Sequence, residues 1–287
     1  MSRLVTLIAI VVFLMGGRVS AIPGPSAIAQ EAATGITMER GVPYGEADGQ
    51  MLLLDVYLPP AAAAPRPAVI LLPGWEATRS SIITPAQAVA EAGYVAFAVD
   101  YRLHWPEHID DAQLAVRWVR ANAGQYGVDP DRICSYGQST GGQLAAMLGV
   151  RDTRDESEPA LAQYSSRVAC AVDISGETDM TIPYTEDFWN AWLVDQLGGT
   201  LAEKPERYRD VSPVAFVDAQ SAPFLVIHGG RDSVVPMAHA RSLVAALQAA
   251  GVEVVYADLV DDDHSSVADW GVSGAFTLAF LDRHLHP

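Results

Sequence analysis

The chain has 287 residues, of which 50% are hydrophobic and 18% charged, and this composition excludes intrinsic disorder and collagen-like repeats. Thirty-five acidic residues against 18 basic ones give a formal net charge of −17. This excess of negative charge argues against nucleic acids and anionic membrane surfaces as partners, because both bind basic proteins.

The first 29 residues have the features of an export signal. Arg3 gives a positive start, and Leu4–Met15 is a run of twelve residues in which only Thr6 is polar. That length suits the hydrophobic region of a signal peptide and is short for a membrane span. Small residues precede two predicted cleavage points, after Ala21 and after Ala29. We therefore expect a secreted or periplasmic protein that meets the membrane only through a transient signal peptide, with an uncleaved anchor as the alternative.

The chain has two cysteines, Cys134 and Cys170. Each precedes the end of a predicted strand by a similar number of residues, so the two are candidates for neighbours in a sheet. Export to an oxidising compartment would permit a disulfide between them. The sequence nevertheless favours two buried thiols that act as small hydrophobic side chains, and their spacing is not that of a zinc site.

After the leader, short apolar runs alternate with amphipathic helical patterns. Ala68–Leu72 and Tyr94–Val99 are continuous apolar runs, as expected for strands buried on both faces of a parallel sheet. Ile109–Ala123 has an apolar stripe at helical spacing, with Arg117 and Arg120 on the other side. The further predicted strands are Gln50–Leu58, Arg132–Tyr136, Ala169–Ile174, Phe224–Ile227 and Val252–Leu259, and the further predicted helices are Pro85–Ala92, Ser139–Leu148, Met237–Ala250 and Val267–His284. This alternation predicts an α/β fold with a mostly parallel central sheet and helices on both faces.

One interval, residues 177–219, breaks the alternation because it is polar, long for a connection and without a strand pattern. We expect one domain over residues 30–287 with a small helical cap inserted at about 177–219. The aromatic residues of the interval include Tyr184, Phe188, Trp189 and Trp192. Together with Trp75 and Trp105 they either line a substrate pocket or pack the cap onto the sheet, and both interpretations are open.

The segment Gly137–Gly142, which reads Gly-Gln-Ser-Thr-Gly-Gly, lies between a predicted strand and a predicted helix. A nucleophile on a sharp strand-to-helix turn needs small neighbours, and the helix N-terminus favours developing negative charge. Ser139 is therefore the candidate nucleophile. The alternative role for Ser139 is a plain helix N-cap.

A serine hydroxyl needs a base, and the base needs a carboxylate that orients it. His264 lies in a loop between the last predicted strand and the last predicted helix, which makes it the candidate base. Asp232 follows the Phe224–Ile227 strand and is expected at the same edge of the sheet as Ser139. The alternatives, Asp261–Asp263, are direct neighbours of His264 and more typical of a solvated acidic loop.

The remaining histidines are expected to have other roles. His239, His284 and His286 are expected at the surface, and His228 is expected to be structural. His104 and His108 have the i, i+4 spacing of a metal site on a helix, but Pro106 between them breaks such a helix.

Stabilisation of an oxyanion needs backbone donors close to the nucleophile. The turn after Ala68–Leu72 reads Pro73-Gly74-Trp75, and the backbone N–H groups of Trp75 and Thr140 are the candidate donors. The alternative for this segment is an ordinary turn that ends a strand.

From about Tyr44 onward the chain resembles the alpha/beta hydrolase superfamily, and within it the carboxylesterases related to hormone-sensitive lipase and the polysaccharide-deacylating esterases. The segments that carry the resemblance are Asp100–Leu103, Ala115–Arg120, Gly127–Ile133 and Gly176–Asp179, and together they are more specific than the serine motif. The resemblance implies the alpha/beta hydrolase fold with Ser139 as nucleophile, Asp232 as acid and His264 as base. Pro73-Gly74-Trp75 is shorter than the His-Gly-Gly-Gly-Trp segment of these relatives, and Thr140 replaces their more usual alanine.

The expected function is that of an exported serine carboxylesterase that hydrolyses short-chain acyl esters, either small or borne on a polysaccharide, through an acyl-enzyme. The chemistry needs neither a metal nor an organic cofactor. A secreted serine peptidase or amidase of the same fold and a non-catalytic binding protein on this scaffold are the alternatives.

Overall fold

The computed structural model describes residues 30–31, 35–60 and 65–285. The predicted signal peptide, both predicted cleavage points and His286 lie outside the described residues. None of the helices in the described part of the chain is both long and apolar enough to cross a membrane.

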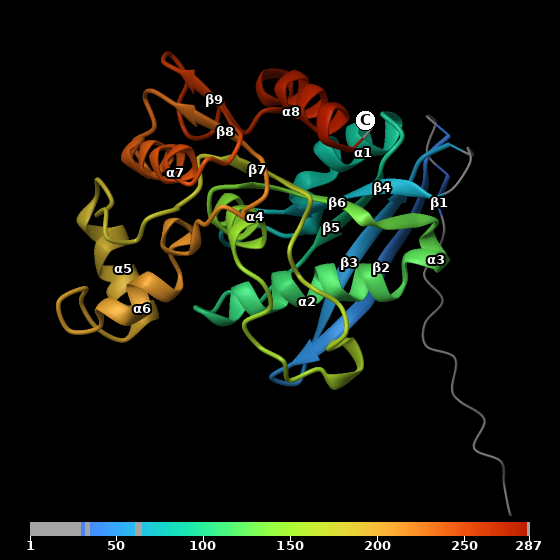
Figure 1. Cartoon of the computed structure of the whole chain (residues 1–287), viewed down its shortest axis with the longest axis horizontal. Coiled ribbons are helices and arrows are strands. Elements are labelled where there is room, and N and C mark those ends of the chain that lie inside the picture. Colours follow the sequence, from blue (N-terminus) through green and yellow to red (C-terminus); the bar gives the residue numbers. More distant parts are fainter. Residues whose placement is uncertain (1–29, 32–34, 61–64, 286–287) are drawn as a thin grey trace, which may run out of the picture.

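The core of the molecule is one twisted sheet with the strand order β1-β2-β3-β5-β4-β6-β7-β8-β9 (Figure 1). Its strands are β1 Gln30–Glu31, β2 Thr37–Ala47, β3 Gln50–Leu58, β4 Arg66–Leu72, β5 Val95–Val99, β6 Val128–Gln138, β7 Cys170–Ile174, β8 Phe224–Gly229 and β9 Val254–Leu259. From β5 to β9 neighbouring strands are parallel, whereas β1, β2, β3 and β5 pair antiparallel at the other end. The predicted α/β fold with a mostly parallel sheet is confirmed.

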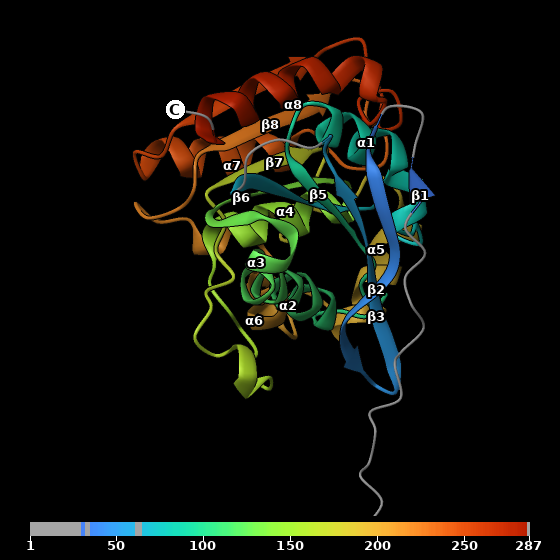
Figure 2. The ribbon, with the colours of Figure 1, turned by 90° about the vertical axis from the view of Figure 1, so that its right-hand side faces the viewer.

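Helices cover both faces of this sheet (Figure 2). They are α1 Ile83–Glu91, α2 Glu107–Ala121, α3 Ala123–Tyr126, α4 Thr140–Val150, α5 Asp187–Leu197, α6 Pro205–Asp210, α7 Ala238–Ala249 and α8 Trp270–Leu285. Alternate residues of a strand point to opposite faces, so Ile70 and Leu72 of β4 belong to the apolar layer that also contains residues of α2, α4 and α7. Val69 and Leu71 pack with α1 and α8 on the other face. Two apolar layers therefore enclose a buried sheet, which explains the continuous apolar runs in the sequence.

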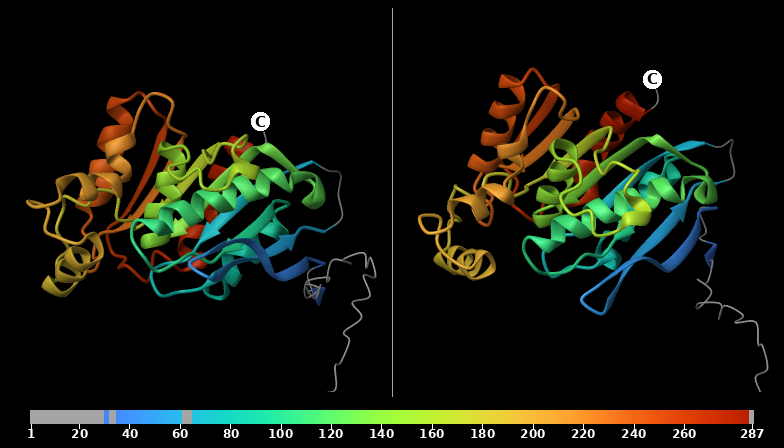
Figure 3. Two further views of the ribbon diagram at one scale, coloured as in Figure 1. Left: turned by 90° about the horizontal axis from the view of Figure 1, so that it is seen from below. Right: turned by 60° about the horizontal axis from the view of Figure 1, so that its bottom comes forward.

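The segment between β7 and β8 forms the helical cap and projects at one end of the molecule (Figure 3). It contains α5, α6 and a 3-10 turn at Pro213–Phe216, and no strand lies among these described residues. Its helices are short and partly exposed, yet Leu193 and Leu197 of α5 are buried. The cap therefore has its own packed contact with the body of the molecule.

Some predictions from the sequence were wrong. The strand Thr37–Ala47 was not predicted, and Arg117, expected on the polar side of its helix, is only 2% exposed. Arg117 is buried because its guanidinium donates to the carbonyls of Asp155, Glu158 and Leu161, which lie in the loop that folds over α2. Each of its three nitrogens has an acceptor, and these hydrogen bonds offset part of the cost of burying the charge.

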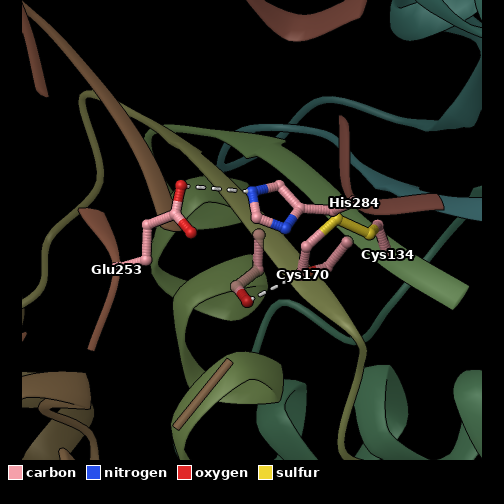
Figure 4. The surroundings of a disulfide bond; sticks show 6 residues. Cys134, Cys170, Glu253 and His284 are labelled. Atoms are coloured by element: carbon pink, nitrogen blue, oxygen red, sulfur yellow. Dashed lines mark hydrogen bonds and ion pairs between the residues drawn. A yellow bond between two sulfur atoms is a disulfide. The ribbon is translucent and has the colours of Figure 1, made fainter. Parts of the chain in front are cut away.

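The preference for two free thiols was also wrong, because Cys134 and Cys170 form a disulfide (Figure 4). The two residues are direct partners in the parallel pairing of β6 and β7, and their Cα atoms are 4.7 Å apart. That spacing lies within the range that a disulfide spans. His284 lies beside the disulfide, and its Nε2 is 3.7 Å from a carboxylate oxygen of Glu253. The prediction that His284 is exposed was wrong, because the side chain is half-buried.

Candidate active site

Ser139 occupies a sharp turn between β6 and α4. Its backbone has φ 56° and ψ −127°, a conformation that residues other than glycine rarely adopt. A Cβ on Gly137 would collide with the carbonyl of Gly141, and a Cβ on Gly141 would collide with the carbonyls of Leu72 and Pro73. The glycines of the sequence motif are therefore required by close backbone packing. They hold Ser139 at the carboxyl edge of the sheet, as the strand-to-helix pattern predicts.

Asp232 and His264 are brought together at the same edge. Nδ1 of His264 lies 2.7 Å from Oδ2 of Asp232, and the other carboxylate oxygen accepts the backbone N–H groups of Val234 and Val235 at 2.9 and 2.8 Å. The Asp232 carboxylate is fully buried, and the His264 ring is 15% exposed. Asp232 is thus held in one orientation, and it holds the imidazole in turn.

The loop that carries His264 lies beside the turn that carries Ser139. The side-chain amide of Gln138 donates to the backbone carbonyl of His264 at 3.4 Å. Because Gln138 directly precedes Ser139, this contact joins the two segments. The structure therefore pairs Asp232 with His264 and places the His264 loop beside the turn of Ser139, with the three residues at the carboxyl ends of β6, β8 and β9.

The electrostatics of the pair suit a base. Burial acts to lower the pKa of His264, but the hydrogen bond and negative charge of Asp232, followed by the charges of Glu177 and Asp263, outweigh it and raise the pKa above its ordinary value. Burial acts to raise the pKa of Asp232, but the hydrogen bond and charge of His264 outweigh it and the pKa is lowered. Asp232 therefore stays ionised under conditions in which His264 exchanges a proton.

The predicted oxyanion turn lies against Ser139. A Cβ built on Gly74 would lie 3.6 Å from the Cβ of Ser139, so Gly74-Trp75 passes directly beside it. The buried hydroxyl of Tyr101 donates to the carbonyl of Pro73 at 2.7 Å and fixes the turn. Thr140 is the first residue of α4, so its N–H has no acceptor one turn earlier in the helix. Both predicted donors, the backbone amides of Trp75 and Thr140, are thus on segments that border Ser139.

The predicted pocket aromatics divide into two groups. Trp192 of α5 packs edge-on to Trp75 at 4.8 Å between ring centroids, to Trp105 at 5.6 Å and to Trp189 at 6.0 Å. Phe188 is 67% exposed and contacts only Trp189 among these rings in the described chain. Trp192 therefore packs the cap onto the turn that contains Trp75, which supports the packing interpretation for Trp192. Contact of these aromatic residues with substrate stays a prediction.

The other described histidines have surroundings that differ from those of His264. His228 is buried, as expected for a structural residue, with Nε2 3.0 Å from the carbonyl of Val235 and 3.4 Å from Asp232. His239 was expected at the surface, but it is buried because the start of the cap segment covers it, and its Nδ1 accepts the N–H of Asp179. His104 is exposed and hydrogen-bonded to Glu107, while His108 is buried against Gln143.

Sequence reasoning missed one charged residue of the site, Glu177. Glu177 begins the polar interval 177–219 and lies in the Gly176–Asp179 segment, and neither pattern predicts that it is 4% exposed and that its charge acts on His264. Burial raises the pKa of Glu177 to about 7, against the opposing effect of the nearby His264. A signal was present in the sequence, since this carboxylate follows the strand next to the one that leads to Ser139.

Comparisons with known proteins agree with this architecture. The sequence profile of the BD-FAE family matches residues 54–247. Esterase LipQ of Mycobacterium tuberculosis is 31% identical over 244 residues, which are 78% of this chain and 56% of that protein. Esterase LipC of the same organism is 34% identical over 241 residues, or 78% of this chain and 59% of that protein. The chain thus spans about half the length of the curated relatives it matches.

Solved structures share the fold. A truncated form of a carbohydrate esterase from gut microbiota superimposes with a TM-score of 0.77 at 24% identity and covers 89% of this chain and 99% of its own. A thermophilic esterase from the Planctomycetes species Thermogutta terrifontis, solved with propionate bound, has a TM-score of 0.73 at 24% identity and covers 92% of this chain and 97% of its own.

Proposed function

This chain belongs to the BD-FAE family, and on that basis we propose that it is a serine carboxylesterase that uses Ser139, His264 and Asp232. The observation that carries the proposal is the buried Asp232–His264 hydrogen bond of 2.7 Å beside the strained turn at Ser139. The names of the curated relatives, esterases LipQ and LipC, support the same reaction class.

In the proposed mechanism, His264 accepts the proton of the Ser139 hydroxyl as its oxygen attacks the ester carbonyl. The backbone amides of Trp75 and Thr140 donate hydrogen bonds to the resulting oxyanion. The protonated His264 then gives its proton to the departing alcohol, and Asp232 stabilises the imidazolium in the meantime. Water repeats the sequence on the acyl-enzyme and releases the acid.

We propose short acyl groups as substrates, carried on a small alcohol or on a polysaccharide. The support is the close packing of Trp192 on Trp75, which places a bulky aromatic wall next to the turn beside Ser139. The Thermogutta terrifontis esterase was solved with propionate and with butyrate bound, which is consistent with a short-chain site on this fold.

We propose that the protein is exported. The apolar run Leu4–Met15 with its following small residues supports this, and so does a disulfide inside the sheet, because disulfides persist mainly in oxidising compartments. Fractionation of expressing cells, with mass spectrometry of the mature N-terminus, tests the proposal. A start at residue 22 or 30 in the exported fraction is expected, and an uncleaved chain in the cytoplasm would contradict it.

Initial rates on p-nitrophenyl acetate, butyrate and decanoate, with Ser139→Ala alongside, test the reaction. We expect rates that fall with acyl length and a loss of about a thousandfold or more in the variant. Parallel assays on p-nitroanilide amides would reveal an amidase. Wild-type rates in Ser139→Ala would show that Ser139 is not the nucleophile.

A further inference from the structure

Glu177 lies at the carboxyl edge of β7, the strand between those that lead to Ser139 and Asp232. The sheet order places β6, β7 and β8 side by side, and each contributes one residue just past its end: Ser139, Glu177 and Asp232. Parallel strands present their carboxyl ends along one edge, so the three residues share that edge. Glu177 therefore occupies the middle position of the site.

The Glu177 carboxyl is buried without full hydrogen bonding. Its Oε2 has no hydrogen-bond partner within the described residues, although the side chain is only 4% exposed. The nearby Tyr184 hydroxyl acts to lower the pKa of the carboxyl. Burial of a carboxyl without a cation costs free energy, so a residue of this kind is expected to have a partner in at least one state of the protein.

The charged and titratable groups around Glu177 come from several elements. They are Tyr101 after β5, Asp173 on β7, Tyr184 in the cap segment, Asp232 after β8 and His264 before α8. Of these, His264 is the one that becomes a cation. Protonated His264 is therefore the only member of this set that could balance a negative Glu177.

We propose that Glu177 is a positioning residue of this site, a second buried carboxylate that acts with Asp232 to stabilise His264 in its protonated form. The inference rests on the proposed function for its catalytic meaning. During turnover His264 carries a positive charge while the tetrahedral intermediate exists, and two carboxylates stabilise that charge more than one does. Asp232 fixes the orientation of the ring through Nδ1, and Glu177 adds charge without replacing that hydrogen bond.

The test is a titration of the His264 imidazole by NMR, followed by the pH dependence of kcat/KM. The titration uses Ser139→Ala protein with and without Glu177→Gln, and Ser139→Ala/His264→Asn identifies the signal. Glutamine keeps the size of the side chain and an acceptor for Tyr184. Because a negative charge that stabilises the cation is removed, we expect the pKa of His264 to fall by about one unit. In protein that keeps Ser139, the acidic limb of the pH profile of kcat/KM should shift to lower pH in Glu177→Gln. The value of kcat should fall about tenfold with little change in KM.

Asp179→Asn is the matched control, since it removes one negative charge from the same segment. Asp179 accepts hydrogen bonds from Thr181 and Ser242, and it is not among the main groups that shift the pKa of His264. The His264 titration in Asp179→Asn should therefore match that of the parent, whereas an equal shift in both variants would overturn the proposal in favour of a general charge effect.

The two proposals fail separately. Absence of serine-dependent ester hydrolysis in the wild type would reject the proposed function, yet the titration of His264 still decides the role of Glu177. An unchanged pKa of His264 in Glu177→Gln would overturn the inference while leaving the esterase intact. If Glu177→Gln does not fold, Tyr184→Phe is the second variant. Loss of the hydroxyl raises the pKa of Glu177, so Glu177 carries less negative charge near pH 7 and the pKa of His264 should fall. An unchanged pKa of His264 in this variant would reject the proposal.

Discussion

The hydroxyl of Tyr101 donates a hydrogen bond of 2.7 Å to the carbonyl of Pro73, and both groups are buried. Tyr101 follows β5 and Pro73 follows β4, so this bond ties together the ends of two parallel neighbours beside Ser139. The position of the Trp75 amide depends on this turn. A single phenolic hydroxyl is thus expected to matter for the proposed oxyanion site.

Tyr101→Phe is expected to lower kcat about tenfold with little effect on KM, because the turn loses its anchor while the substrate pocket keeps its shape. Steady-state kinetics on p-nitrophenyl acetate measure this. Tyr44→Phe is the matched control, since the Tyr44 hydroxyl donates to the Asp100 carbonyl at 2.6 Å. Both variants should lose about 1–2 kcal/mol of stability, and only Tyr101→Phe should lose activity. Equal kinetics in the two variants would argue against the role given to the turn.

The rate of ester hydrolysis should depend on the protonation of His264. Its pKa is raised above the ordinary value of 6.5, and only the neutral ring accepts a proton from Ser139. We therefore expect kcat/KM to decline as the pH falls through an apparent pKa above 6.5 and to reach a plateau at higher pH. A plot of kcat/KM from pH 5 to 9 tests this. A plateau that extends below pH 6 would be inconsistent with the Asp232–His264 pair as described.

Replacement of both cysteines, Cys134→Ala with Cys170→Ala, should destabilise the protein. The disulfide closes a segment with a sequence separation of 36 residues, and chain-entropy arguments assign such a loop about 3–4 kcal/mol. Urea unfolding of the double variant should show a loss of about 2–4 kcal/mol. The wild type with and without reductant in the denaturant is the control. An unchanged midpoint in both comparisons would show that the cross-link contributes little.

Trp192→Ala should loosen the contact between the cap and the oxyanion turn. Loss of the packing on Trp75 and Trp105 opens space beside Ser139, so the ratio of kcat/KM for decanoate over acetate should rise several-fold. Trp118→Ala is the control, because Trp118 packs on Tyr126 near the C-terminal end of α2, whereas Trp105 lies just before its N-terminal end. The control should lose stability and keep the wild-type acyl preference. The same preference in Trp192→Ala would exclude the cap from chain-length selection.

The sequence predicts the central sheet well because Ala68–Leu72 and Tyr94–Val99 are buried on both faces and leave continuous apolar runs. It does not predict β2, where Glu39 and Arg40 interrupt the apolar pattern and register shifts fall between Glu39 and Val42. Irregular pairing of this kind removes the alternation on which strand prediction depends.

The placement of Ser139, Asp232 and His264 at one edge of the sheet was predictable because each follows a predicted strand, and parallel strands end at one edge. His239, Arg117 and the disulfide were not, because each depends on contacts between distant segments. The cap segment covers His239, the loop after α4 covers Arg117, and the register of β6 on β7 aligns the cysteines. Periodicity along one element does not determine which other segment covers it.

The backbone of Ser139 lies in a conformation that costs about 1–3 kcal/mol for a residue with a Cβ. Glycine would adopt the same angles without that penalty, and it would have no hydroxyl. Selection for thermal resistance and selection for activity therefore favour different residues at position 139. A laboratory evolution experiment that selects for stability alone is expected to recover glycine at position 139. Its products would be more stable proteins that have lost the proposed nucleophile.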